Sequence, residues 1–89
     1  MGTVSLDREV KALILNVAIS TRRATARIGY FKKRDRWVKI GEEWIDVRPS
    51  EDELEKYPDR IQYLRARLRA EVERRLRELG VKLLRPYTW

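Results

Sequence analysis

A regular apolar stripe in residues 59–79 constrains the fold more than any other feature of the sequence. Its members recur at steps of three and four residues, as on one face of an α-helix: Ile61, Leu64, Leu68, Val72, Leu76 and Leu79. The residues between them are mostly helix-forming, and Gly80 stands where such a helix commonly ends. The sequence therefore predicts a helix over residues 59–79. A lone helix cannot bury this stripe, so an earlier part of the chain must cover it.

The segment before this helix has the pattern of paired strands. Residues 8–19 are rich in Val, Ile and Leu, and residues 24–33 alternate between apolar and polar side chains. Pairing Ile19 with Ala24 would place the apolar side chains of both strands on one face. The cross-strand pairs that we then expect are Val17–Ala26, Leu15–Ile28 and Leu13–Tyr30.

Residues 33–35 are expected to form a turn, and residues 36–47 then allow two arrangements. Gly41 and Glu42 fit a two-residue hairpin turn between two short strands, which we favour. The alternative keeps residues 36–47 as one strand with a bulge at Gly41. The turn at 33–35, with Lys32 opposite Arg36, predicts the pairs Tyr30–Val38, Ile28–Ile40, Phe31–Trp37 and Gly29–Lys39. The hairpin at Gly41-Glu42 predicts the pairs Val38–Ile45, Lys39–Trp44 and Trp37–Asp46.

The rest of the chain completes an α+β prediction. Pro49 ends the sheet, and Ser50 followed by Glu53 forms a capping box for a short helix at 51–57. The C-terminal Tyr87-Thr88-Trp89 is either a tether onto the core or a disordered end. We thus expect a single small basic domain over residues 1–89: a four-stranded antiparallel β-meander at about 8–47, packed on one face by the helix at about 59–79. In the order of its elements only, this arrangement resembles the single-stranded-DNA-binding transcription coactivators.

The residue types limit the chemistry. Histidine and cysteine are both absent, which removes the commonest general base, the commonest metal ligand and every disulfide. No phosphate-binding loop, dinucleotide motif or nucleophile elbow is present. The acidic residues near Ser50 are better explained by helix capping than by a metal site. We therefore expect a protein that is not an enzyme and that has no cofactor. Without a secretory or membrane-spanning apolar run, a cytoplasmic location away from membranes is expected.

The charge is high and unevenly distributed. The formal net charge is +7, made up of +7 in residues 1–41, −6 in residues 42–59 and +6 in residues 60–89. Such a basic chain favours nucleic acid or another anionic surface as its partner. The alternative is the ion-paired surface of a thermophile protein, which the low content of Met, Asn and Gln also fits.

The sheet face turned away from the helix is the candidate binding surface. Aromatic platforms among basic side chains suit single-stranded DNA or RNA, since bases stack and phosphates find cations. Gly29 in the middle would leave room for a ligand. The same aromatic residues could instead pack with Ala12 and Ile14 as a second small core, or form a homodimer or partner-protein interface. The candidate residues are Arg23, Arg27, Phe31, Lys33, Trp37, Lys39 and Trp44 on this face, with Lys32, Lys33, Arg34 and Arg36 at the tip of the hairpin.

Overall fold

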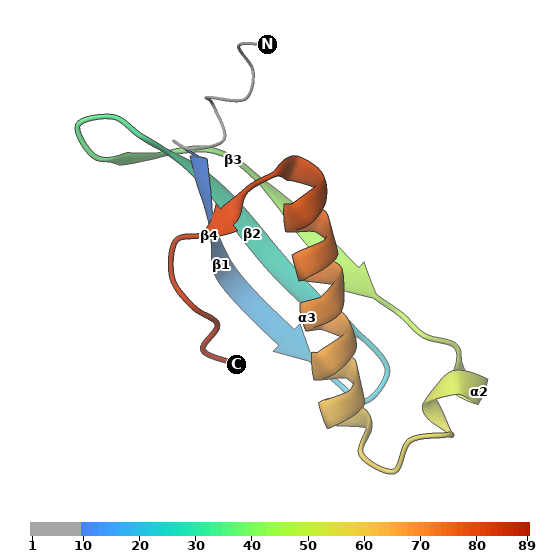
Figure 1. Cartoon of the computed structure of the whole chain (residues 1–89). Coiled ribbons are helices and arrows are strands. Elements are labelled where there is room, and N and C mark those ends of the chain that lie inside the picture. The colour runs from blue at the N-terminus through green and yellow to red at the C-terminus, as the bar shows by residue number, and fades with distance from the viewer. Residues whose placement is uncertain (1–9) are drawn as a thin grey trace.

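A computed structural model describes residues 10–89, which form one β-sheet covered on one face by one long helix (Figure 1). The predicted α+β class is confirmed. Residues 8 and 9 of the predicted first strand lie outside the described residues. In the described part of the chain, no helix is long and apolar enough to cross a membrane. The elements are β1 (Val10–Ile19), β2 (Ala24–Lys33), β3 (Trp37–Val47), α2 (Glu51–Leu54), α3 (Arg60–Leu79) and β4 (Lys82–Leu83).

The sheet has the order β3-β2-β1-β4 and is mixed, so the predicted four-stranded antiparallel meander is wrong. β1, β2 and β3 are antiparallel neighbours, but β4 follows α3 and runs parallel to β1. Because α3 carries the chain back along the sheet, the apolar segment after Gly80 arrives beside β1. A strand therefore follows the helix, and the resemblance to the coactivators in order of elements does not hold.

β3 is one continuous strand, so the favoured hairpin at Gly41-Glu42 is wrong. The alternative of a single bulged strand is right, except that the bulge lies one residue before Gly41. The register shifts where Phe31 pairs with Lys39 and Tyr30 pairs with Gly41, which leaves Ile40 as the extra residue. A continuous strand gives β2 a backbone partner from Ala24 to Lys33. A hairpin at Gly41 would have paired residues 43–47 with residues 36–40 and left the first residues of β2 without a partner on this edge.

The β1–β2 register is as predicted next to the turn and differs beyond it. Ile19 pairs with Ala24 and Val17 with Ala26, but the register shifts between Ile14 and Asn16. The predicted pairs Leu15–Ile28 and Leu13–Tyr30 are therefore wrong. Their places are taken by Ile14–Ile28 and Ala12–Tyr30.

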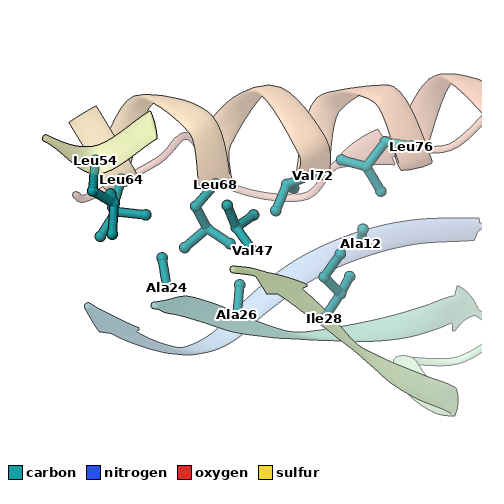
Figure 2. Packing of buried hydrophobic residues seen from close by; sticks show 10 residues of the cluster. All are labelled: Ala12, Ala24, Ala26, Ile28, Val47, Leu54, Leu64, Leu68, Val72 and Leu76. Atoms are coloured by element: carbon teal, nitrogen blue, oxygen red, sulfur yellow. The ribbon is translucent and has the colours of Figure 1, made fainter. Parts of the chain in front are cut away.

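The hydrophobic core lies between α3 and the sheet (Figure 2). Small side chains line the sheet side, since Ala12, Ala24 and Ala26 are all 0% exposed. These alanines let the helix approach the sheet closely. Leu13, which the predicted register placed opposite Tyr30 where Ala12 lies, would have required a wider gap between helix and sheet. The cross-strand pairs expected from the sequence would have put Leu15 and Val38 on this buried side with Ile28, but Leu15 lies over Gly29 on the other face and Val38 is 38% exposed. The helix contributes Leu64, Leu68, Val72 and Leu76, and Ile28, Val47 and Leu54 complete the buried cluster.

Both ends of α3 are capped: Gly80 ends the helix as the sequence indicated, and Asp59, predicted as its first residue, is its N-cap. The Asp59 side chain accepts a hydrogen bond from the Gln62 backbone N–H at 3.1 Å. Gly80 ends the helix with φ 70°, a left-handed conformation that glycine adopts without a steric penalty. The caps explain why the predicted bounds of this helix agree with the structure.

α2 is shorter than the predicted helix at 51–57. Ser50 Oγ accepts from the Glu53 backbone N–H at 3.2 Å, as in a capping box. The Glu53 carboxylate does not complete the box. Instead it accepts hydrogen bonds from the Tyr63 hydroxyl and from Arg67, the latter at 2.5 Å. Glu53 thus ties α2 to the first turns of α3.

The C-terminal segment is a tether, which settles the alternative left open by the sequence. The Leu84 backbone N–H donates to the Ala12 carbonyl at 2.7 Å, just beyond β4. The Arg69 guanidinium lies 4.6 Å from the Tyr87 ring centroid and 5.2 Å from that of Trp89. The segment runs beside β1 and covers its outer edge (Figure 1).

Leu68→Ala tests the packing of α3 on the sheet. Leu68 is 0% exposed, so removing three carbons leaves a cavity between the layers. We expect a loss of about 2–5 kcal/mol in the free energy of unfolding, measured by urea denaturation. A change of only a few tenths would contradict this packing.

Tyr30→Phe tests a partly buried hydrogen bond at the edge of the core. The Tyr30 hydroxyl donates to Glu43 at 2.5 Å, and Arg75 donates to the same carboxylate at 3.1 Å. Burial, and then Glu43, raise the pKa of Tyr30 above its ordinary value of about 10. The unfolded chain then releases this proton first, so stability falls as pH rises above about 10. We expect Tyr30→Phe to lose less stability than wild type between neutral and alkaline pH in denaturation curves. An identical slope in both proteins would contradict the assignment.

Candidate nucleic-acid interface

The face of the sheet opposite α3 is built by the residues of β2 and β3 that alternate with the core. Ala24, Ala26 and Ile28 point into the core, so the residues between them point away from the helix. We call this surface the open face. Its cross-strand pairs are Arg27–Trp44, Gly29–Glu42, Phe31–Lys39 and Lys33–Trp37.

Three of these four pairs join a cation to an aromatic ring, and we call them the cation–aromatic ladder. The Arg27 guanidinium carbon lies 5.8 Å from the Trp44 ring centroid. The Lys33 Nζ lies 5.5 Å from the centroid of Trp37. Each cation is attracted by the negative face of its ring. The indoles are thereby held on the surface with positive charge beside them.

Trp44 is the most accessible of the aromatic platforms. It is 56% exposed and forms one wall of a shallow hollow of about 580 Å³. Arg23 lines the same hollow, and its guanidinium donates to both carboxylate oxygens of Asp46, at 3.2 and 3.1 Å. The hollow therefore combines an open indole face with a positioned guanidinium. Ala18, Ile19, Ser20 and Thr25 complete its lining.

One acidic residue, Glu42, lies inside the ladder opposite Gly29, although the sequence predicts it in a turn. The Glu42 carboxylate accepts a hydrogen bond from Lys39 Nζ and lies 3.8 Å from Arg27 Nη1. The hydrogen bond from Lys39 holds the pKa of Glu42 below its ordinary value, with smaller contributions from the charges of Lys39 and Arg27. Glu42 remains ionised at neutral pH and partly neutralises two cations of the open face.

The space above Gly29 is filled, so the expectation that it leaves room for a ligand is wrong. A Cβ on Gly29 would lie 2.8 Å from Leu15 Cδ1 and 3.0 Å from Phe31 Cε1. Leu15 reaches this position because of the bulge in β1. Phe31 is accordingly half-buried. It packs in a second small core, as the alternative interpretation of the sequence allowed, but with Leu15 and not with Ala12 and Ile14.

The structure brings most of the predicted site residues together. Arg27, Phe31, Lys33, Trp37, Lys39 and Trp44 share the open face, and Arg23 borders the hollow beside it. Lys32 does not belong to this group, because it alternates to the other face of β2. Arg34 and Arg36 are exposed in the β2–β3 turn, where the Arg34 N–H donates to the Arg36 carbonyl at 2.9 Å.

The predicted neighbours within this set were wrong. Phe31 lies opposite Lys39, not Trp37, and Trp44 lies opposite Arg27, not Lys39. The expected turn at 33–35 is wrong, because Lys33 pairs with Trp37 and the turn is formed by residues 34–36, which moves the partner of Phe31. The continuous course of β3 then places Trp44 opposite Arg27. Within residues 10–89, no group of three or more Asp or Glu side chains lies close enough to hold a metal ion.

The chain was compared with models of known protein families, with curated proteins and with solved structures, and none of the three comparisons gives a significant match.

Gly29→Ala tests whether Leu15 and Phe31 are packed above the sheet. The added methyl group would overlap Leu15, so we expect a loss of about 1–3 kcal/mol in the free energy of unfolding. Gly41→Ala is the matched control, since no atom lies within 4 Å of its added Cβ. It should change stability by less than about 0.5 kcal/mol. Equal stabilities of the two variants in urea denaturation would contradict the packed arrangement.

Proposed function

We propose that this protein binds single-stranded nucleic acid on its open face and acts by binding, not by catalysis. The observation that carries the proposal is the cation–aromatic ladder, with Trp44 exposed beside Arg27 and Trp37 beside Lys33. Single-stranded DNA and RNA present unstacked bases and a phosphate backbone, which need aromatic platforms and cations close together. Either nucleic acid fits this chemistry.

The distribution of charge supports the same function. Arg22 and Arg23 are exposed at one end of β2, and Lys33, Arg34 and Arg36 are exposed at the other. Cations at both ends of the ladder can bind phosphates that flank the stacked bases. Binding of this kind releases counterions, so affinity should fall steeply as the salt concentration rises.

A second candidate function uses the same surface as an interface with another copy of the chain or with a partner protein. The observation in its favour is the apolar centre of the open face, where Leu13, Leu15 and Phe31 are only partly buried. Large apolar side chains gathered on a surface often mark protein contacts. The two candidates differ in what the tryptophans do, and substitution separates them.

Trp44→Ala and Trp37→Ala are expected to weaken binding of a single-stranded oligonucleotide by about 1–3 kcal/mol each, because each removes a stacking platform. Arg27→Ala should weaken binding less, and should reduce the slope of log K against log salt by about one contact. Fluorescence titration at several salt concentrations measures both quantities. Tyr57→Ala is the matched control, since Tyr57 is an exposed aromatic residue between α2 and α3.

The rival function makes different forecasts for the same samples. In a dimer interface, Trp37→Ala and Trp44→Ala would lower the melting temperature and make the mass depend on concentration. Unchanged oligonucleotide affinity together with a dissociated or destabilised protein would contradict nucleic-acid binding at these residues.

A further inference from the structure

We propose that Arg27 and Lys39 form a phosphate subsite at the centre of the open face, and that Glu42 occupies this subsite in the free protein. The carboxylate of Glu42 then stands in for a phosphate of the bound strand. This inference deepens the proposed function and depends on it for the identity of the ligand.

The contacts of Glu42 are those that a phosphate oxygen would make. Its carboxylate accepts a hydrogen bond from Lys39 Nζ, and its other oxygen lies 3.8 Å from Arg27 Nη1. The two cations come from neighbouring strands, and the anion lies between them. Ammonium and guanidinium groups that hold a carboxylate in this way also suit a phosphate.

The position of Glu42 in the ladder separates this arrangement from an ordinary surface ion pair. The pair Gly29–Glu42 has Arg27–Trp44 on one side and Phe31–Lys39 on the other. Pairs on one face of a strand recur about every 6.7 Å. A stacked strand advances about 3.4 Å per nucleotide, and a fully extended one roughly twice that, so a strand with its base on Trp44 brings a phosphate close to the next pair.

A phosphate can replace the Glu42 carboxylate because the Glu42 side chain is accessible to solvent. The Glu42 side chain is one-third exposed, at 34%, so it can turn into solvent when a phosphate enters. The Arg27 and Lys39 side chains, at 38% and 45% exposed, remain to hold that phosphate. Until then, Glu42 keeps these cations positioned and reduces the attraction of the face for other anions. Binding of a strand must overcome this competition, which lowers the affinity of the wild-type protein.

Glu42→Gln tests the subsite, because the amide keeps the shape and removes the competing charge. Glu78→Gln is the matched control, since Glu78 also bridges two cations, Arg74 at 2.8 Å and Arg75 at 3.3 Å, but lies on α3. The two variants have the same net charge. The probes are a single-stranded oligothymidylate and inorganic tripolyphosphate, which carries phosphates without bases.

We expect Glu42→Gln to bind both probes about two- to tenfold more tightly than wild type at low salt. Its log–log salt slope for the oligothymidylate should steepen by about 0.7 for each cation that a phosphate newly engages. Glu78→Gln should stay within about twofold of wild type, because its cations lie outside the open face. Melting temperatures of both variants confirm that the fold is retained.

Other outcomes would overturn either the phosphate subsite or the proposed function. Equal effects of the two variants would indicate a response to net charge alone and would overturn the phosphate subsite. Weaker binding by Glu42→Gln would overturn it too, since Glu42 would then support binding and not compete with it. If wild type and both variants bind no oligothymidylate, the proposed function fails. In that case tighter tripolyphosphate binding by Glu42→Gln alone would still support the subsite.

Discussion

The packing of the α3 stripe on alanines of the sheet is the constraint on which the rest of the structure depends. Ala12, Ala24 and Ala26 make the helix-facing side of the sheet shallow, so the larger Leu68 and Val72 fill the space between the layers (Figure 2). This contact decides which side of each strand is buried. It thereby also decides which side chains remain on the open face. The candidate interface consists of the side chains that alternate with the core residues along the strands. A change in which side chains face the core would therefore change which side chains form the interface.

Bulges in β1 and β3 adjust the strands to this constraint. They explain why the faces of β2 were predicted correctly from the sequence and its cross-strand partners were not. Alternation placed Arg27, Phe31 and Lys33 on one face correctly, because a strand without a bulge keeps its parity. The extra residues Leu15 and Ile40 changed the partners of β2 on both sides. A bulge has no reliable signal in a single sequence, since its cause is the fit of distant side chains.

The other predictions also succeeded where the cause is local in the sequence and failed where it is distant. The bounds of α3 were predictable because Asp59 and Gly80 act within a few residues of its ends. β4 was not predictable, since two residues become a strand only when α3 places them beside β1. Glu42 was missed as a member of the candidate site for the same reason. Its neighbours Arg27 and Lys39 are brought to it by the continuous course of β3, against the hairpin that we favoured.

The C-terminal tether has a consequence for the outer edge of β1. An uncovered strand edge is a template for pairing with another chain. The edge of β1 is paired by β4 at Lys11 and Ala12, and the segment that ends in Tyr87 and Trp89 lies beside Leu13, Ile14 and Leu15. β3 has no strand on its outer side within residues 10–89, but its bulge and its charged side chains disfavour the flat pairing that aggregation requires. Removal of the segment that ends in Tyr87 and Trp89 would therefore leave the β1 edge beyond Ala12 uncovered, where pairing with a strand of another chain becomes possible.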